Sequence, residues 1–143
     1  MIAHEVVRAG AGLVLGHGPH AINGIEFFEG VFIVHSMGNF FFDIAVDETY
    51  FIPEAKPFAR LFHQHEKFWH GIVVEARVDG RSHPDELRLI PFEIPRKSRY
   101  AGLPRSPSRA VAQRIGRRLS EKSVGLGVAI ASLPDGTFSA RPQ

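Results

Sequence analysis

The sequence contains no cysteine among its 143 residues, which excludes a disulfide framework and a thiolate-bound metal. Any metal ion would have to be held by histidine, aspartate, glutamate or asparagine side chains. Long apolar runs are also missing, because a run such as Val31–Val34 is far shorter than the roughly 20 residues of a membrane-spanning helix. The length is close to the roughly 150 residues typical of one domain, so we predict a single globular domain without a transmembrane segment.

Acidic residues are scarce in the second part of the chain. Residues 1–80 contain 5 Lys and Arg against 10 Asp and Glu, whereas residues 81–143 contain 12 against 5. A basic segment is compatible with an anionic partner, although solvated arginines on an amphipathic surface are the simpler explanation. The arginines are not interleaved with aromatic residues, so we predict no nucleic-acid partner.

Apolar periodicity and turn residues predict an α/β fold. The first part is expected to contain a helix that ends near Ala9, a strand over Leu13–Leu15 buried on both faces, and a hairpin of 24–28 and 31–35. Glycine in the Glu29-Gly30 turn of this hairpin can supply a positive φ. Residues 44–67 are predicted to be mostly loop, with a short helix near 58–63.

The second part is expected to be antiparallel. Residues 72–78 and 86–94 form one predicted strand pair, and 127–131 and 137–140 form a final hairpin. Between them, Ser106-Pro107 resembles a helix start, with serine as the N-cap. Three apolar residues spaced by four then form the stripe of an amphipathic helix: Val111, Ile115 and Leu119.

The loop after the first predicted strand is the most informative segment. His17 and His20 flank a stiff Gly-Pro step there, where ligand sites of α/β proteins are built. Neutral imidazoles bind zinc, iron and other divalent ions, but a catalytic metal usually has three or more protein ligands. The spacing alone leaves open the alternative of two loop histidines bonded to backbone or water.

A second segment, Ser36-Met37-Gly38-Asn39, offers further candidates. Ser36 does not fit the turn of a serine nucleophile, because Val34 stands where that motif has its first glycine. Asn39 could orient a phosphate or a metal-bound water, or could cap a turn. The histidine-rich stretch His63–His70 is expected to be a solvated loop.

These segments together closely resemble the CapA family of capsule-synthesis proteins, which are linked to poly-γ-glutamate. The resemblance is carried by Ala9–Glu26, including Gly16-His17-Gly18-Pro19-His20, and by Ser36-Met37-Gly38-Asn39-Phe40. It continues in Arg99–Arg105 and in the helix that ends near Ser120. The family looks like calcineurin-type metallophosphoesterases, so the resemblance implies a four-layer α/β/β/α sandwich.

The resemblance implies a metal site and a substrate cleft. His20 matches the last histidine of the family's metal-binding H-P-H motif, while Gly18 replaces its first histidine, so His17 is the candidate substitute. Asn39, with Ser36, is the implied catalytic pair, and Gly38 and Asn39 are the implied substrate contacts. The implied cofactor is one or more divalent ions, such as Mn, Zn, Fe or Mg, and the implied substrate is a phosphoester or an anionic polymer.

The resemblance covers only the C-terminal half of the family's domain. The D-x-H, G-D and N-H motifs of metallophosphoesterases are absent, so residues 1–143 are expected to be a partial domain that is inactive alone. Residues 1–43 would carry the metal loop and the G-N-F turn, and 70–143 the antiparallel strands and the arginine-rich helix. The missing half would expose a strand edge that can pair with another chain.

Family members are often membrane-anchored or extracytoplasmic, which leaves the location of this chain open. The alternative function is a noncatalytic module that binds an anionic polymer or a protein.

Overall fold

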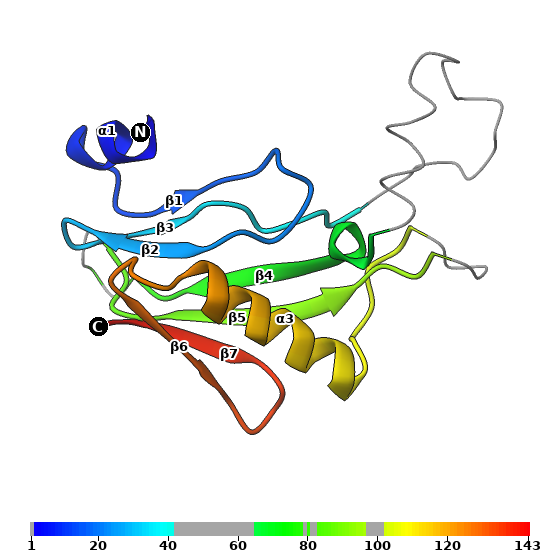
Figure 1. The fold of residues 1–143 in the computed structure, drawn as a ribbon. Coiled ribbons are helices and arrows are strands. Elements are labelled where there is room, and N and C mark those ends of the chain that lie inside the picture. The colour runs from blue at the N-terminus through cyan, green and yellow to red at the C-terminus, as the bar shows by residue number, and fades with distance from the viewer. Residues whose placement is uncertain (1, 42–64, 79, 81–82, 97–101) are drawn as a thin grey trace, which may run out of the picture.

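The computed structural model describes residues 2–41, 65–78, 80, 83–96 and 102–143. The chain forms two sheets with α1 and α3 packed against them (Figure 1). The elements follow in the order α1 (Ile2–Arg8), β1 (Val14–Leu15), β2 (Ile25–Phe28), β3 (Val31–Val34), η3 (Glu66–Trp69), β4 (His70–Ala76), β5 (Leu87–Glu93), α3 (Arg109–Lys122), β6 (Val128–Ser132) and β7 (Phe138–Pro142). The predicted α/β class is therefore confirmed in broad terms.

The first sheet is mixed, with the strand order β1-β3-β2. β1 runs parallel to β3, and β2 pairs with β3 as the predicted hairpin. In its turn Glu29 has φ 49° and Gly30 has φ 85°. A two-residue type I′ hairpin turn requires positive φ values at both of these positions. The glycine therefore has the predicted role, and Glu29 shares the left-handed conformation.

The second sheet is antiparallel, with the order β4-β5-β7-β6, and contains both predicted strand pairs. The two sheets join beside the Ser36–Asn39 turn, where Gly38 bridges to Gly71 and the Ile72 N–H donates to the Met37 carbonyl at 3.0 Å. α3 covers the second sheet. The main core includes buried side chains of both sheets and of α3, so the two sheets share one apolar interior.

Three local predictions were wrong. Leu15 is 47% exposed rather than buried, because β1 lies at the edge of its sheet with β3 as its paired strand. α3 begins two residues later than predicted, since Ser108 rather than Ser106 is the N-cap and its hydroxyl accepts the Val111 N–H. His70 is 4% exposed rather than solvated.

The short helix predicted near 58–63, together with His63 and Gln64, lies outside the described residues. Within the described parts of the chain, no helix has the length and apolar character of a membrane span.

Candidate functional site

His20 and Asn39 meet at one edge of the first sheet. His20 lies in the loop that follows β1, and Asn39 lies in the turn that follows β3. Because β1 and β3 are parallel neighbours, with Val14 opposite Ile33, the segments leaving their carboxyl ends emerge at the same edge. The topology thus brings together two side chains that are 19 residues apart.

The Asn39 amide has a fixed orientation. Its Nδ2 donates to two carbonyls, that of His20 at 3.2 Å and that of Phe68 at 2.9 Å. Its Oδ1 therefore faces the His20 ring, 2.8 Å from Nδ1. An amide oxygen only accepts, so the Nδ1 of His20 must carry the hydrogen. A neutral His20 in this tautomer has its lone pair on Nε2, which is the arrangement of a metal-ligating histidine held by a second residue.

The backbone around His20 is held in an uncommon conformation. His20 has φ 56°, a left-handed value that few residues other than glycine adopt, and Gly18 has φ 127°. The hydrogen bonds from Asn39 offset the cost of this conformation, because Asn39 is only 3% exposed and its amide bonds both the ring and the carbonyl of His20. Such conformations cluster at functional sites.

His17 lies beside His20 but on the surface. The two ring centroids are 6.2 Å apart and the rings make an edge contact at 80°. In the described parts of the chain, no group of three or more His, Asp or Glu side chains is arranged to hold a metal. The histidine pair therefore supplies fewer ligands than the three that a catalytic zinc site usually has.

Ser36 and Gly38 shape the turn that presents Asn39. Ser36 is fully buried, and its hydroxyl accepts the Gly38 N–H at 3.4 Å. Gly38 has φ 81°, and a Cβ at this position would lie 2.5 Å from the His70 carbonyl oxygen. These contacts give both residues a structural role in the turn, while a catalytic role of Ser36 and substrate contacts of Gly38 and Asn39 stay predictions.

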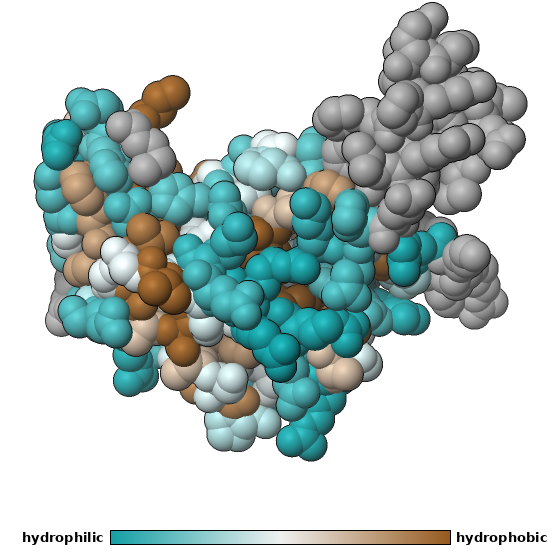
Figure 2. All heavy atoms as spheres, viewed as in Figure 1, coloured by the Kyte–Doolittle hydropathy of each residue, from teal (hydrophilic) through white to brown (hydrophobic). Residues whose placement is uncertain are grey.

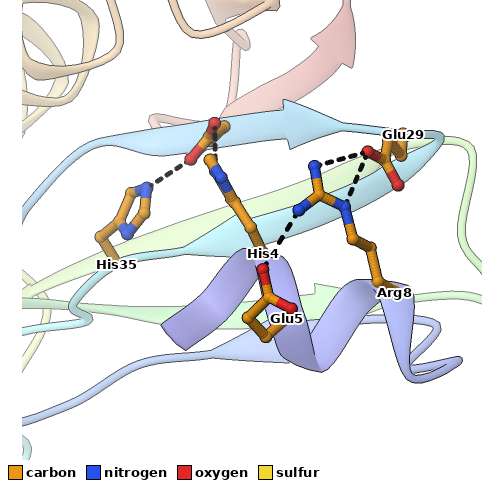
Figure 3. A network of polar contacts seen from close by, with 6 residues as sticks. His4, Glu5, Arg8, Glu29 and His35 are labelled. Carbon is orange, nitrogen blue, oxygen red and sulfur yellow. Dashed lines mark hydrogen bonds and ion pairs between the residues drawn. The ribbon is translucent and has the colours of Figure 1, made fainter. Parts of the chain in front are cut away.

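A second polar cluster was not expected from the sequence. The buried Glu26 carboxylate accepts from His4 Nε2 on one oxygen and from His35 Nε2 on the other, both at 2.9 Å. Figure 3 shows His4 and His35 directed at this common carboxylate from α1 and from the end of β3. His4 also stacks on Phe28, with ring centroids 3.8 Å apart. The cluster attaches α1 to the sheet.

Nothing in the local sequence identifies these partners. His4 and His35 are single histidines, and they are separated from Glu26 by 22 and 9 positions. The sequence signal that was available is Glu26 itself, an acidic residue inside the otherwise apolar predicted strand 24–28. A buried carboxylate needs donors, and imidazoles are suitable ones.

The family comparison points to the segment that holds the candidate site. The model of the bacterial capsule synthesis protein PGA_cap matches residues 1–44. This match includes His17, His20, Ser36, Gly38 and Asn39. The remaining residues lie outside it.

Similarity to whole proteins extends further along the chain. Two Sinorhizobium fredii proteins, y4sH and y4uA, both described as uncharacterized, are each 29% identical over 157 residues, covering 90% of this chain and 34% of theirs. The PGA biosynthesis protein CapA of Bacillus subtilis is 43% identical over 42 residues, 29% of this chain and 11% of that protein. The chain thus spans about a third of the length of the Sinorhizobium relatives.

Proposed function

We propose that this chain contributes the histidine loop and the Asn39 turn of a metal-dependent, phosphatase-like centre in a capsule-synthesis type protein. The observation that carries the proposal is the 2.8 Å contact between His20 Nδ1 and Asn39 Oδ1. It fixes the His20 tautomer whose Nε2 can bind a divalent ion. The match of residues 1–44 to the PGA_cap model supports the assignment to capsule synthesis.

In this proposal His20 is the principal ligand and His17 assists it. A divalent ion held there would acidify a bound water and polarise an ester, which is the chemistry of such centres. Asn39 positions His20 by holding its ring and carbonyl. Two imidazoles are too few for a catalytic centre, and the part of the chain that the structure describes offers no group of three or more ligands. The chain alone is then expected to bind metal weakly and to have little hydrolase activity.

Calorimetric titration of Zn²⁺ and Mn²⁺ into the purified chain tests the metal role. We expect weak binding, and we expect His20→Ala to reduce the metal affinity by about tenfold or more. His83→Ala removes a histidine far along the chain and should leave the affinity unchanged. Turnover of a synthetic phosphodiester should stay near background. A metal affinity of His20→Ala equal to that of the unmodified chain would contradict the ligand role of His20. Robust turnover by the chain alone would contradict the need for further ligands.

A second candidate function is binding of an anionic polymer by α3. Hydrophilic side chains gather over this helix in Figure 2. Among the described residues, Arg109 and Arg117 have no ion-pair partner, while Arg114 pairs with Glu66 at 3.2 Å. Binding to polyglutamate that weakens steeply with salt would support this candidate, because contacts between exposed charges are screened.

A further inference from the structure

Two buried side-chain nitrogens lack a hydrogen-bond partner among the described residues: His70 Nδ1 and Arg118 Nη1. His70 is the first residue of β4 and is 4% exposed. Buried polar atoms are nearly always hydrogen-bonded, and leaving a charged donor unpaired costs several kcal/mol. Each of these two atoms therefore needs an explanation.

The two atoms belong to segments that run side by side. Arg114 on α3 pairs with Glu66 at the start of η3, with 3.2 Å between Arg114 Nε and Glu66 Oε1. Arg118 follows Arg114 by one helical turn, and His70 follows Glu66 by four residues. The charge of Arg118 acts on His70, which places Arg118 on the flank of α3 nearest the beginning of β4.

The electrostatics of His70 agree with this placement. Burial is the main cause that lowers the pKa of His70, and the positive charges of Arg118 and Arg114 lower it further. Glu66 and Glu93 are the acidic groups that act in the opposite direction. Burial therefore favours the neutral form of the His70 imidazole, and charges of both signs lie close enough to act on it.

We propose that His70 and Arg118 bind one oxyanion group, a carboxylate or a phosphate, between β4 and α3. A guanidinium gives its strongest hydrogen bonds to such groups. The anion would accept from Arg118 Nη1 and from a protonated His70 Nδ1, satisfying both buried atoms at once.

This site adjoins the turn that contains Asn39. The Asn39 amide donates to the carbonyl of Phe68, two residues before His70, and Gly38 bridges to Gly71, the residue after it. That the anion is the acidic group of a substrate rests on the proposed function. The binding of an oxyanion does not.

The test is an NMR titration. Inorganic phosphate, and separately acetate, is added to the ¹⁵N-labelled chain, and the imidazole signals of His70 are monitored. We expect a saturable shift and an increase in the pKa of His70. Arg118→Gln should abolish both, while Arg117→Gln, which removes the same charge from an exposed position of α3, should retain them. Comparing acetate with phosphate distinguishes a general oxyanion site from one that is selective for carboxylates or for phosphates.

Two results would overturn the proposal. If His70 does not respond to either anion, an ordered water is the partner of the two nitrogens. If Arg117→Gln removes the response as fully as Arg118→Gln, the effect is diffuse charge rather than a site. If Arg118→Gln does not fold, Arg118→Lys is the variant to test. It retains the charge and should weaken phosphate binding without abolishing it. Zinc affinity measured on the same samples separates a failure here from a failure of the proposed function.

Discussion

Asn39 connects the turn after β3 to the loop after β1 and to η3, since its one amide bonds His20 and the Phe68 carbonyl. Asn39→Ala leaves the carbonyls of His20 and Phe68 without these donors and removes the acceptor that faces His20 Nδ1. We expect a loss of about 1–3 kcal/mol in the free energy of unfolding, measured with urea. Zinc affinity should fall by about 10- to 100-fold, because the ring is no longer held in one tautomer.

Gln113→Ala is the matched control, since it removes an exposed amide from α3. It should change neither quantity. Zinc affinity that is unaltered in Asn39→Ala would show that the amide does not position His20.

Glu26 provides a second residue-scale prediction. Glu26→Gln removes the charge that both His4 and His35 face, and it places an NH₂ group against one of the two imidazoles. Hydrogen bonds to a charged group are each worth about 1.5–3 kcal/mol, so we expect a loss of at least that size in urea unfolding at pH 7.5. Glu29→Gln is the comparison, because the exposed pair of Glu29 with Arg8 should contribute about 0–1 kcal/mol. Equal effects of the two substitutions would contradict a buried role of the Glu26 carboxylate.

The sequence could indicate His20 and Asn39 because each follows a predicted strand, and parallel neighbours bring such segments to one edge. It could not indicate the Glu26 cluster or the burial of His70. Those contacts depend on where α1 and α3 pack, and no spacing within the sequence records that. Arg118 illustrates the same limit: it occurs in the helix with the exposed Arg114 and Arg117, yet its Nη1 is buried.

At the scale of the elements, the start of α3 distinguishes two serines. Ser108→Ala removes the hydroxyl that accepts the Val111 N–H and should cost about 1 kcal/mol in thermal or urea unfolding. Ser106→Ala, two residues earlier, should have little effect. The reverse order would place the cap at Ser106, as the sequence pattern predicted.

The regular elements could be predicted largely from the sequence, because hairpins and amphipathic helices are governed by local turn residues and periodicity. The Glu29-Gly30 turn and the stripe of Val111, Ile115 and Leu119 behave as predicted. The strand at Leu13–Leu15 does not, because an apolar run cannot reveal whether its strand lies in the centre or at the edge of a sheet.

For the whole molecule, the buried His70 makes stability depend on pH. Its pKa is lowered in the folded chain, chiefly by burial, while in the unfolded chain it is near 6.5. Below about pH 6.5 the unfolded state therefore binds a proton that the folded state does not, and the free energy of unfolding should decrease as the pH falls from 7 towards 5.

Urea unfolding in phosphate-free buffer between pH 5 and 7.5 measures this slope. His70→Gln should reduce the slope regardless of its effect on absolute stability, and His83→Gln should preserve it. An unchanged slope in His70→Gln would show that His70 does not contribute.

The two sheets share one apolar interior, and the candidate site lies where they join, since Asn39 bonds to the first sheet's loop and to η3, which leads into β4. The proposed ligand role of His20 depends on its tautomer. A long-range ¹H–¹⁵N spectrum of the chain, recorded above pH 7.5 with and without Zn²⁺, measures it directly. We expect Nδ1 to carry the hydrogen and zinc to shift the Nε2 signal. A hydrogen on Nε2, with no response of that nitrogen to zinc, would contradict this ligand role.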